Sequence, residues 1–208
     1  MQNAEKYAII QSRKAVIPVT DAMTLLKNEC EACQNCPLGA TRTNLVFGVG
    51  SPKAQVLFVG EGPGEQEDLQ GEPFVGRSGQ LLDKYLELVG IPRDGGKVYI
   101  ANIVKCRPPH NRDPKPEESE SCLPWLRQQV RLIRPKIIVC LGRIAAQRLI
   151  DPDFRVTREH GAFREKGGIL FMGTFHPAAL LRNPAQKKDA LADFQALREK
   201  MEELRIEN

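Results

Sequence analysis

Four cysteines in this chain have a spacing that could hold a metal. Cys33 and Cys36 form a Cys-x-x-Cys motif, and Cys106 and Cys122 follow much later in the chain. Four thiolates from two distant segments make a closed ligand set, which suits either zinc or an iron–sulfur cluster. The second pair lacks the short spacing common in zinc ribbons, so the cluster is favoured. Zinc and four unligated thiols remain the alternatives.

The other two cysteines and the composition are those of an ordinary globular chain. Cys140 lies in an apolar run and is interpreted as a buried core thiol, while Cys30 is left undecided between bystander and ligand. Six cysteines in 208 residues are too few for a disulfide scaffold. No apolar run reaches the roughly 18 residues of a membrane span, and the first twenty residues carry scattered charges. We therefore expect a cytoplasmic protein with no membrane association.

A second set of candidate residues follows the predicted strands. GEGPGEQED at residues 60–68 combines glycines, which let a backbone approach a ligand closely, with several carboxylates that would repel a pyrophosphate. A neutral planar ligand or a developing cation fits this acidity better. Asn102 is either a satisfied core amide or a reader of a ligand edge. His176 is expected at the same sheet edge as Glu61 and Asn102, which favours a functional role over a structural one.

Basic residues cluster in one proline-rich loop. RPPHNRDPKPEE at residues 107–118 is stiff and carries four basic side chains near its start. A rigid surface for phosphates and a solvated loop are equally good readings of this pattern. The net charge of +4 is permissive for a nucleic-acid partner and proves none.

The order of the predicted elements indicates the fold. Strands are expected at residues 55–59, 97–104, 136–141 and 168–172, each a short apolar run bounded by Gly or Pro. Helices are expected at residues 20–30, 78–89, 117–134, 143–150 and 191–204, with Pro124 as an alternative start for the third. This order predicts an α/β protein, a three-layer α/β/α sandwich around a four-stranded, mainly parallel sheet. Ligands in such folds bind at the carboxyl ends of the strands. Residues 21–208 are expected to form one domain, and residues 1–20 a mobile extension.

Several motifs together resemble the family 4 uracil-DNA glycosylases, the iron–sulfur branch of that superfamily. They are GEGPGEQED at 60–68, EPFVGRSGQLL at 72–82, NIVKCRPPHNRDP at 102–114, Cys122, and FHPAALLRNP at 175–184. The resemblance covers residues 33–198, with the motifs in the family's order and spacing. It implies a uracil-DNA glycosylase-like fold and a monofunctional DNA repair enzyme. This enzyme hydrolyses the N-glycosidic bond of deoxyuridine, releases uracil and leaves an abasic site.

The resemblance also implies roles for individual residues. Cys33, Cys36, Cys106 and Cys122 match the ligands of a four-iron four-sulfur (4Fe-4S) cluster. The uracil site would comprise Glu61, Gly62, Pro63, Glu67, Phe74, Asn102 and His176. Glu61 and His176 are the expected catalytic residues, and Glu67 would line the pocket and exclude the thymine methyl group. Contacts to DNA are expected from Arg107, Arg112, Leu181 and Arg182.

We expect a monomer whose substrate is single- or double-stranded DNA containing uracil. Two other hypotheses stay open. One is a noncatalytic nucleic-acid-binding or redox-sensing module built on an iron–sulfur or zinc site. The other is a glycosylase for a different deaminated base such as hypoxanthine.

Overall fold

A computed structural model describes residues 18–206 of the chain. The expected mobile extension at residues 1–20 therefore falls mostly outside the described residues. Its last two residues begin helix α2 (Val19–Glu31). No helix in residues 18–206 is both long and apolar enough to cross a membrane.

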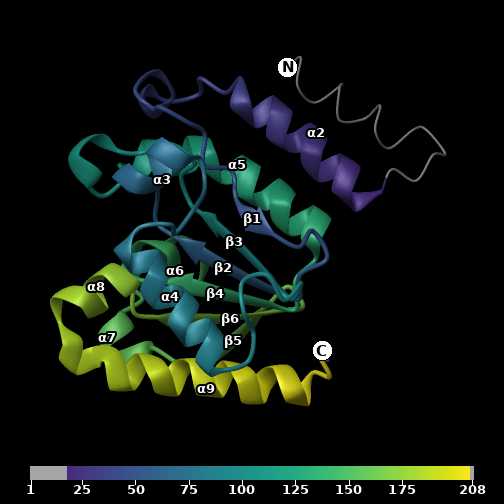
Figure 1. Cartoon of the computed structure of the whole chain (residues 1–208), viewed down its shortest axis with the longest axis vertical. Coiled ribbons are helices and arrows are strands. Elements are labelled where there is room, and N and C mark those ends of the chain that lie inside the picture. Colours follow the sequence, from purple (N-terminus) through teal and green to yellow (C-terminus); the bar gives the residue numbers. More distant parts are fainter. Residues whose placement is uncertain (1–17, 207–208) are drawn as a thin grey trace.

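A six-stranded sheet forms the centre of the fold (Figure 1). Its strands are β1 (Val49–Gly50), β2 (Val56–Gly60), β3 (Val98–Asn102), β4 (Ile137–Leu141), β5 (Phe163–Lys166) and β6 (Ile169–Thr174). Their order is β1-β3-β2-β4-β6-β5, and the middle four are parallel. These four are the predicted strands, so the α/β fold class is confirmed. The register pairs Gly60 with Asn102 and Leu141 with Thr174, which aligns the carboxyl ends at one edge.

The predicted strand count of four was too low, because two short antiparallel strands extend the edges. β1 has only two residues, and Gly50 permits its close approach to β3, since a Cβ there would lie 2.3 Å from the carbonyl oxygen of Val98. β5 reads FREK and is mostly exposed, so it shows no apolar run. Gly167 and Gly168, both with positive φ, turn it into β6.

Alternate strand residues face two separate helical layers. Val56 and Phe58 of β2 pack with the layer of α4 (Arg77–Leu88) and α9 (Lys187–Glu203). Leu57 and Val59 face the layer of α2, α5 (Pro116–Ile133) and α6 (Arg143–Leu149). Because successive strand side chains point to opposite faces, an all-apolar strand must be covered on both sides. The remaining helices are α3 (Glu65–Gln70), α7 (Val156–Glu159) and α8 (Pro177–Arg182), with short 3-10 turns at Pro37–Ala40, Pro109–Asn111 and Pro184–Gln186.

Helix α5 runs through Pro124, so the alternative start at that residue was wrong. Pro116 occupies its first turn, and the Glu118 carboxylate accepts a hydrogen bond from the Lys115 N–H at 2.7 Å, which fixes the start. Pro124 removes one helical hydrogen bond, to the carbonyl of Glu120. Glu120 lies on the exposed side of the helix, so the loss falls where solvent can compensate.

Candidate active site and cysteine site

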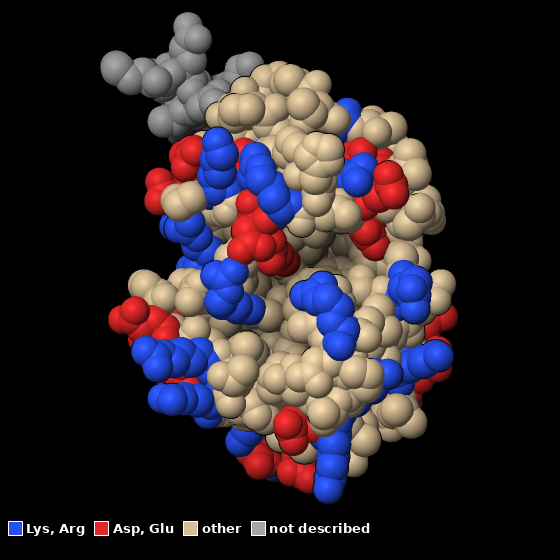
Figure 2. All heavy atoms as spheres, turned by 90° about the vertical axis from the view of Figure 1, so that its left-hand side faces the viewer, with Lys and Arg blue, Asp and Glu red and all other residues tan. Residues whose placement is uncertain are grey.

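A cleft of about 980 Å³ opens at the carboxyl ends of the parallel strands. Figure 2 shows this face of the molecule, hollowed in its middle, with basic side chains on several sides and acidic ones above the hollow. The cleft is lined by all seven residues predicted for the uracil site, namely Glu61, Gly62, Pro63, Glu67, Phe74, Asn102 and His176. The loops after β2, β3 and β6 bring them together.

Asn102 ends β3 with its side chain buried and incompletely paired. The residue is 1% exposed, and Oδ1 has no hydrogen-bond donor in the described part of the chain. A Cβ on Gly60 would lie 2.4 Å from this oxygen and 2.6 Å from Cζ of Phe74, so only glycine fits between the two side chains. Buried acceptors are almost always satisfied. An unpaired amide oxygen at a cleft is therefore suited to accept a hydrogen bond from a ligand.

Phe74 lies beside Asn102 in a backbone conformation that is unfavourable for a bulky residue. Its φ is 57°, in the left-handed region. The side chain is 5% exposed, and its ring lies 5.7 Å from the ring of His176, at an interplanar angle of 33°. A Cβ on Gly79 would lie 1.8 Å from the Phe74 carbonyl oxygen, so α4 can approach the loop only because residue 79 is glycine.

Two charged side chains hold the backbone around Phe74 from opposite ends. The Arg93 guanidinium donates to the carbonyls of Pro73 and Phe74 at 2.9 and 2.7 Å, and Nε donates to Asp83 at 2.8 Å. The Glu67 carboxylate accepts hydrogen bonds from the backbone N–H groups of residues 64, 75 and 76 at 2.9–3.1 Å. Both Glu67 oxygens are therefore engaged in shaping the pocket wall.

His176 caps helix α8 and is held in one tautomer. Its Nδ1 accepts a hydrogen bond from the Ala178 N–H at 3.1 Å, so the neutral ring carries its proton on Nε2. Burial lowers the pKa of His176 to about 4, and the charge of Arg182 acts in the same direction. At neutral pH the side chain is an uncharged N–H donor in the cleft.

Glu61 shares its side of the cleft with a second carboxyl group. Burial, together with the negative charge of Asp113 and a hydrogen bond with it, raises the pKa of Glu61 to about 7. Arg143 opposes that rise and donates to Asp113 Oδ2 at 2.6 Å. Glu61 is therefore close to the midpoint of its own titration at neutral pH.

The residues predicted to contact DNA divide into two groups. Leu181 and Arg182 of α8 line the cleft, as does Arg112. Arg112 also makes a double hydrogen bond with Glu118, at 2.7 and 2.8 Å, which occupies its charge. Arg107 is not among the cleft-lining residues of the described chain, and it pairs with Glu65 at 3.5 Å and with Asn111.

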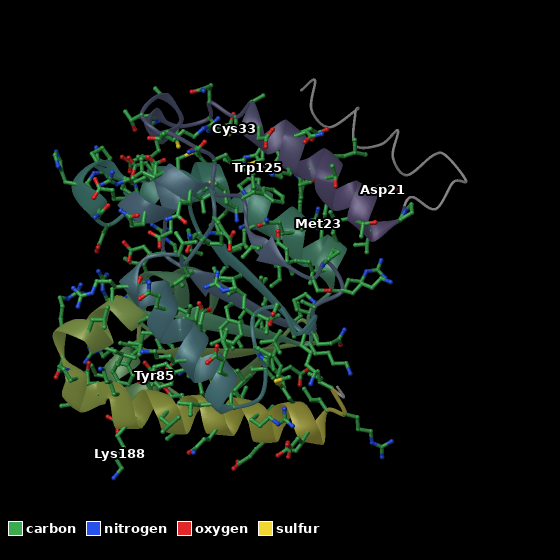
Figure 3. All side chains as sticks on the ribbon, viewed as in Figure 1. Asp21, Met23, Cys33, Tyr85, Trp125 and Lys188 are labelled. Carbon is green, nitrogen blue, oxygen red and sulfur yellow. The ribbon has the colours of Figure 1, made fainter. Side chains whose placement is uncertain are left out.

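The four predicted metal-binding cysteines line a second, small cavity together with Cys30. Three of the sulfurs receive N–H donors. Sγ of Cys33 accepts from the indole of Trp125, Sγ of Cys106 from Arg42, and Sγ of Cys122 from the Lys105 backbone, each at 3.3 Å. Figure 3 shows Cys33 and Trp125 near one another where α2 ends above α5.

Hydrogen bonds of this kind favour thiolates and tune metal–sulfur sites. The six cysteines are all free, and burial raises the pKa of Cys140 in β4, as expected of a core thiol. Within residues 18–206, no three His, Cys, Asp or Glu side chains are arranged to hold a metal ion.

Sequence reasoning overlooked several residues of these sites. Arg143 follows β4 directly, and its place at a strand end was an available signal. Arg93 and Asp113 lie in loops with no such signal. Lys105 was hidden inside an apolar stretch.

Comparison with known proteins defines the class. A family model described as the uracil DNA glycosylase superfamily matches residues 47–200. The chain is 46% identical to the type-4 uracil-DNA glycosylase of Archaeoglobus fulgidus, with 82% of this chain and 89% of the relative aligned. Identity to the type-4 enzymes of Sulfurisphaera tokodaii and Thermotoga maritima is 44% in each case, covering 86% and 78% of this chain and 84% and 85% of the relatives. The chain therefore belongs to the type-4 uracil-DNA glycosylases, a family of DNA repair enzymes.

Proposed function

We propose that the chain hydrolyses the N-glycosidic bond of deoxyuridine in single- or double-stranded DNA, releasing uracil and leaving an abasic site. The observation that carries this proposal is the unpaired Oδ1 of Asn102, which faces the same cleft as Phe74 and His176. Family membership supplies the reaction class, and these side chains supply a site for a planar base.

A base must leave the duplex before this cleft can read it. Phe74 offers a ring for stacking. Oδ1 of Asn102 would accept from uracil N3–H, while its amide would donate to O4. Cytosine presents the reverse pattern at these two positions, so a buried amide held in this orientation rejects it.

The chemistry requires charge stabilisation on both sides of the breaking bond. The electrons of the bond between the sugar C1′ and uracil N1 leave with the base, which becomes anionic, and the sugar becomes cationic. Nε2–H of His176 would donate to the uracil oxygen that gains negative charge, an interaction worth roughly 3–4 kcal/mol. Ionised Glu61 would stabilise the cationic sugar and orient water. The water adds its hydroxyl to C1′, and its proton ends on the leaving uracil.

We also propose that Cys33, Cys36, Cys106 and Cys122 hold a 4Fe-4S cluster. Such a cluster supplies covalent cross-links between the segment after α2, the loop after β3 and helix α5. The N–H donors to three sulfurs support a bound thiolate cluster. The second cysteine pair, Cys106 and Cys122, lacks the short spacing common in zinc ribbons, which favours the cluster over zinc. Absorbance near about 400 nm and iron content test this assignment.

The cleft wall also carries residues for DNA binding and for discrimination against thymine. Arg182 and Leu181, on the cleft wall, would contact DNA, and Glu67 would shape the pocket that excludes the thymine methyl group. We propose that the protein acts as a cytoplasmic monomer.

A base-release assay tests the function. Oligonucleotides carrying one uracil, thymine or hypoxanthine, single-stranded and in mismatches, are incubated with the protein, and free base is measured. Release of uracil alone supports the proposal. Release of hypoxanthine in preference to uracil would identify a different deaminated base as the substrate. DNA binding without any base release would instead indicate a noncatalytic module.

A further inference from the structure

Lys105 is a fully buried cation whose charge no mechanism above has used. The residue is 1% exposed, and its Nζ donates to the carbonyl of Asn102 at 3.0 Å and to Oε1 of Gln129 at 2.7 Å. Both acceptors are uncharged. Lys105 lines the same small cavity as the thiols of Cys30, Cys106 and Cys122.

A buried ammonium needs more than two neutral acceptors. Transfer of a charged group from water into a protein interior is strongly unfavourable unless an opposite charge accompanies it. In residues 18–206, no Asp or Glu carboxylate forms an ion pair with Lys105. The opposite charge must therefore come from the cysteine side.

We propose that Lys105 is the internal counter-cation of the iron–sulfur cluster and that it couples the cluster to Asn102. This rests on the proposed function, which assigns the cluster to the four cysteines. Four thiolates outweigh the positive charge of an iron–sulfur core, so the bound cluster is an anion. The cluster thus supplies the charge that the ammonium lacks.

The chain places Lys105 between the two sites. Its backbone N–H donates to Sγ of Cys122 at 3.3 Å, and Cys106 is the next residue. Its side chain returns to the carbonyl of Asn102, three residues earlier, at the end of β3. Gln129 of α5 accepts the second hydrogen bond of the ammonium, and its own amide donates to the Phe47 carbonyl at 2.9 Å. One residue therefore links the proposed cluster ligands to the backbone of Asn102, whose side chain would read uracil.

Substitutions of Lys105 in the cluster-containing protein separate the effect of its charge from the effect of its hydrogen bonds. Lys105→Met removes both, Lys105→Gln keeps a polar end without charge, and Lys105→Arg keeps the charge. Lys136→Met is the matched control, because Lys136 is an exposed lysine that donates to the Leu204 carbonyl. The readouts are the midpoint potential of the cluster and the rate at which an iron chelator removes its absorbance.

The Met and Gln variants should shift the midpoint to more negative potentials, because loss of a nearby positive charge disfavours an added electron. Both should also lose the cluster at least tenfold faster than the wild type. Lys136→Met should match the wild type. Unchanged potentials in both variants would overturn the proposal, as would a Gln variant that behaves like the wild type while Met does not. If Met and Gln do not load a cluster, loading by Arg supports the role of charge, and equal failure of all three contradicts it.

Failure of this proposal can be distinguished from failure of the proposed function. Wild-type protein that contains no iron refutes the cluster itself. Wild-type protein that contains the cluster and excises uracil, with Lys105 variants of unchanged potential and stability, refutes only the role of Lys105.

Discussion

Oδ1 of Asn102 is buried and has no donor among residues 18–206, and Glu61 lies against a second carboxyl group. Each arrangement lowers the stability of the folded protein when no ligand is bound, because an unpaired buried acceptor and a crowded carboxylate both raise the free energy of the native state. Such strain is expected where side chains are set for a ligand and not for stability. Substitutions at these residues should therefore separate stability from activity.

Asn102→Ala should abolish most activity without unfolding the protein. Truncation removes the group proposed to read uracil and also removes the unpaired oxygen, so the two stability effects oppose each other. We expect single-turnover excision to fall at least tenfold, with a melting temperature near that of the wild type. Calorimetry and rapid-quench kinetics measure the two quantities. Wild-type excision rates in this variant would remove Asn102 from the site.

Glu61→Gln should stabilise the protein above pH 7 and reduce its activity. The native pKa of about 7 exceeds the ordinary value of 4.5, so folding is disfavoured as pH rises through this window. Below about pH 4.5 both states are protonated and the variant should match the wild type. At pH 8 we expect the free energy of unfolding to rise by about 1–2 kcal/mol, after allowance for solvent screening. Chemical denaturation at both pH values tests this sign.

The pH dependence of catalysis offers a matched control at Asp113. If ionised Glu61 is required, the excision rate should rise as pH increases through about 7. Asp113→Asn removes the neighbouring charge, so the midpoint of the profile should move to lower pH. An unchanged midpoint in Asp113→Asn would show that another group controls the profile.

The segment between α3 and α4 is held in place by side chains that lie outside it. Phe74 adopts φ 57°; Arg93 binds the carbonyls of Pro73 and Phe74, and Glu67 binds the N–H groups of the two residues that follow. The stacking ring is thus placed by side chains from neighbouring segments. This backbone conformation depends on these bonds.

Arg93→Met should weaken base recognition through the position of Phe74. Without the two hydrogen bonds to the carbonyls of Pro73 and Phe74, the backbone of Phe74 can leave its left-handed conformation. The stacking ring would then lose its position, so kcat/KM should fall at least tenfold. Inhibition by free uracil should weaken in parallel, which a defect confined to the chemical step would not produce. Arg198→Met is a suitable control, because Arg198 lies on α9 and pairs with Glu202. Wild-type uracil inhibition in Arg93→Met would contradict this role.

Sequence patterns predicted the helices and strands that are determined by residues within or next to the element itself. The four central strands are continuous apolar runs, and α4 and α6 begin directly after glycines. The edge strands escaped prediction because β1 is two residues long and β5 is charged and exposed. The role of Arg93 at Phe74 could not be recognised either, because it rests on hydrogen bonds to the carbonyls of Pro73 and Phe74, and no sequence pattern marks such contacts.

The whole molecule combines an acidic cleft side with basic side chains around it. Glu61, Glu65, Glu67 and Asp113 line the same cleft as Arg77, Arg112, Arg143 and Arg182. Figure 2 shows acidic side chains above the hollow and basic side chains on several sides of it. Such a distribution attracts phosphates at the rim and favours positive charge inside. The net charge of +4 could not predict this arrangement, because a net charge does not say where the charged side chains lie.

Arg182→Ala should weaken DNA binding and its dependence on salt. If Arg182 contacts one phosphate of a single strand, the magnitude of the slope of log affinity against log salt concentration should fall by about 0.7. Fluorescence anisotropy with a single-stranded oligonucleotide at several salt concentrations measures the slope. Arg131→Ala on α5 controls for net charge and should leave it unchanged. An unaltered slope in Arg182→Ala would exclude the contact.

Uracil excision by the cleft is measured as single-turnover release of free uracil from a deoxyuridine oligonucleotide, for the wild type and for His176→Ala. The wild type should release uracil and leave an abasic site, and a normally folded His176→Ala should do so at least tenfold more slowly. If the wild type releases no uracil, the chain is not a uracil-DNA glycosylase, and equal rates for the two proteins would remove His176 from the catalytic site.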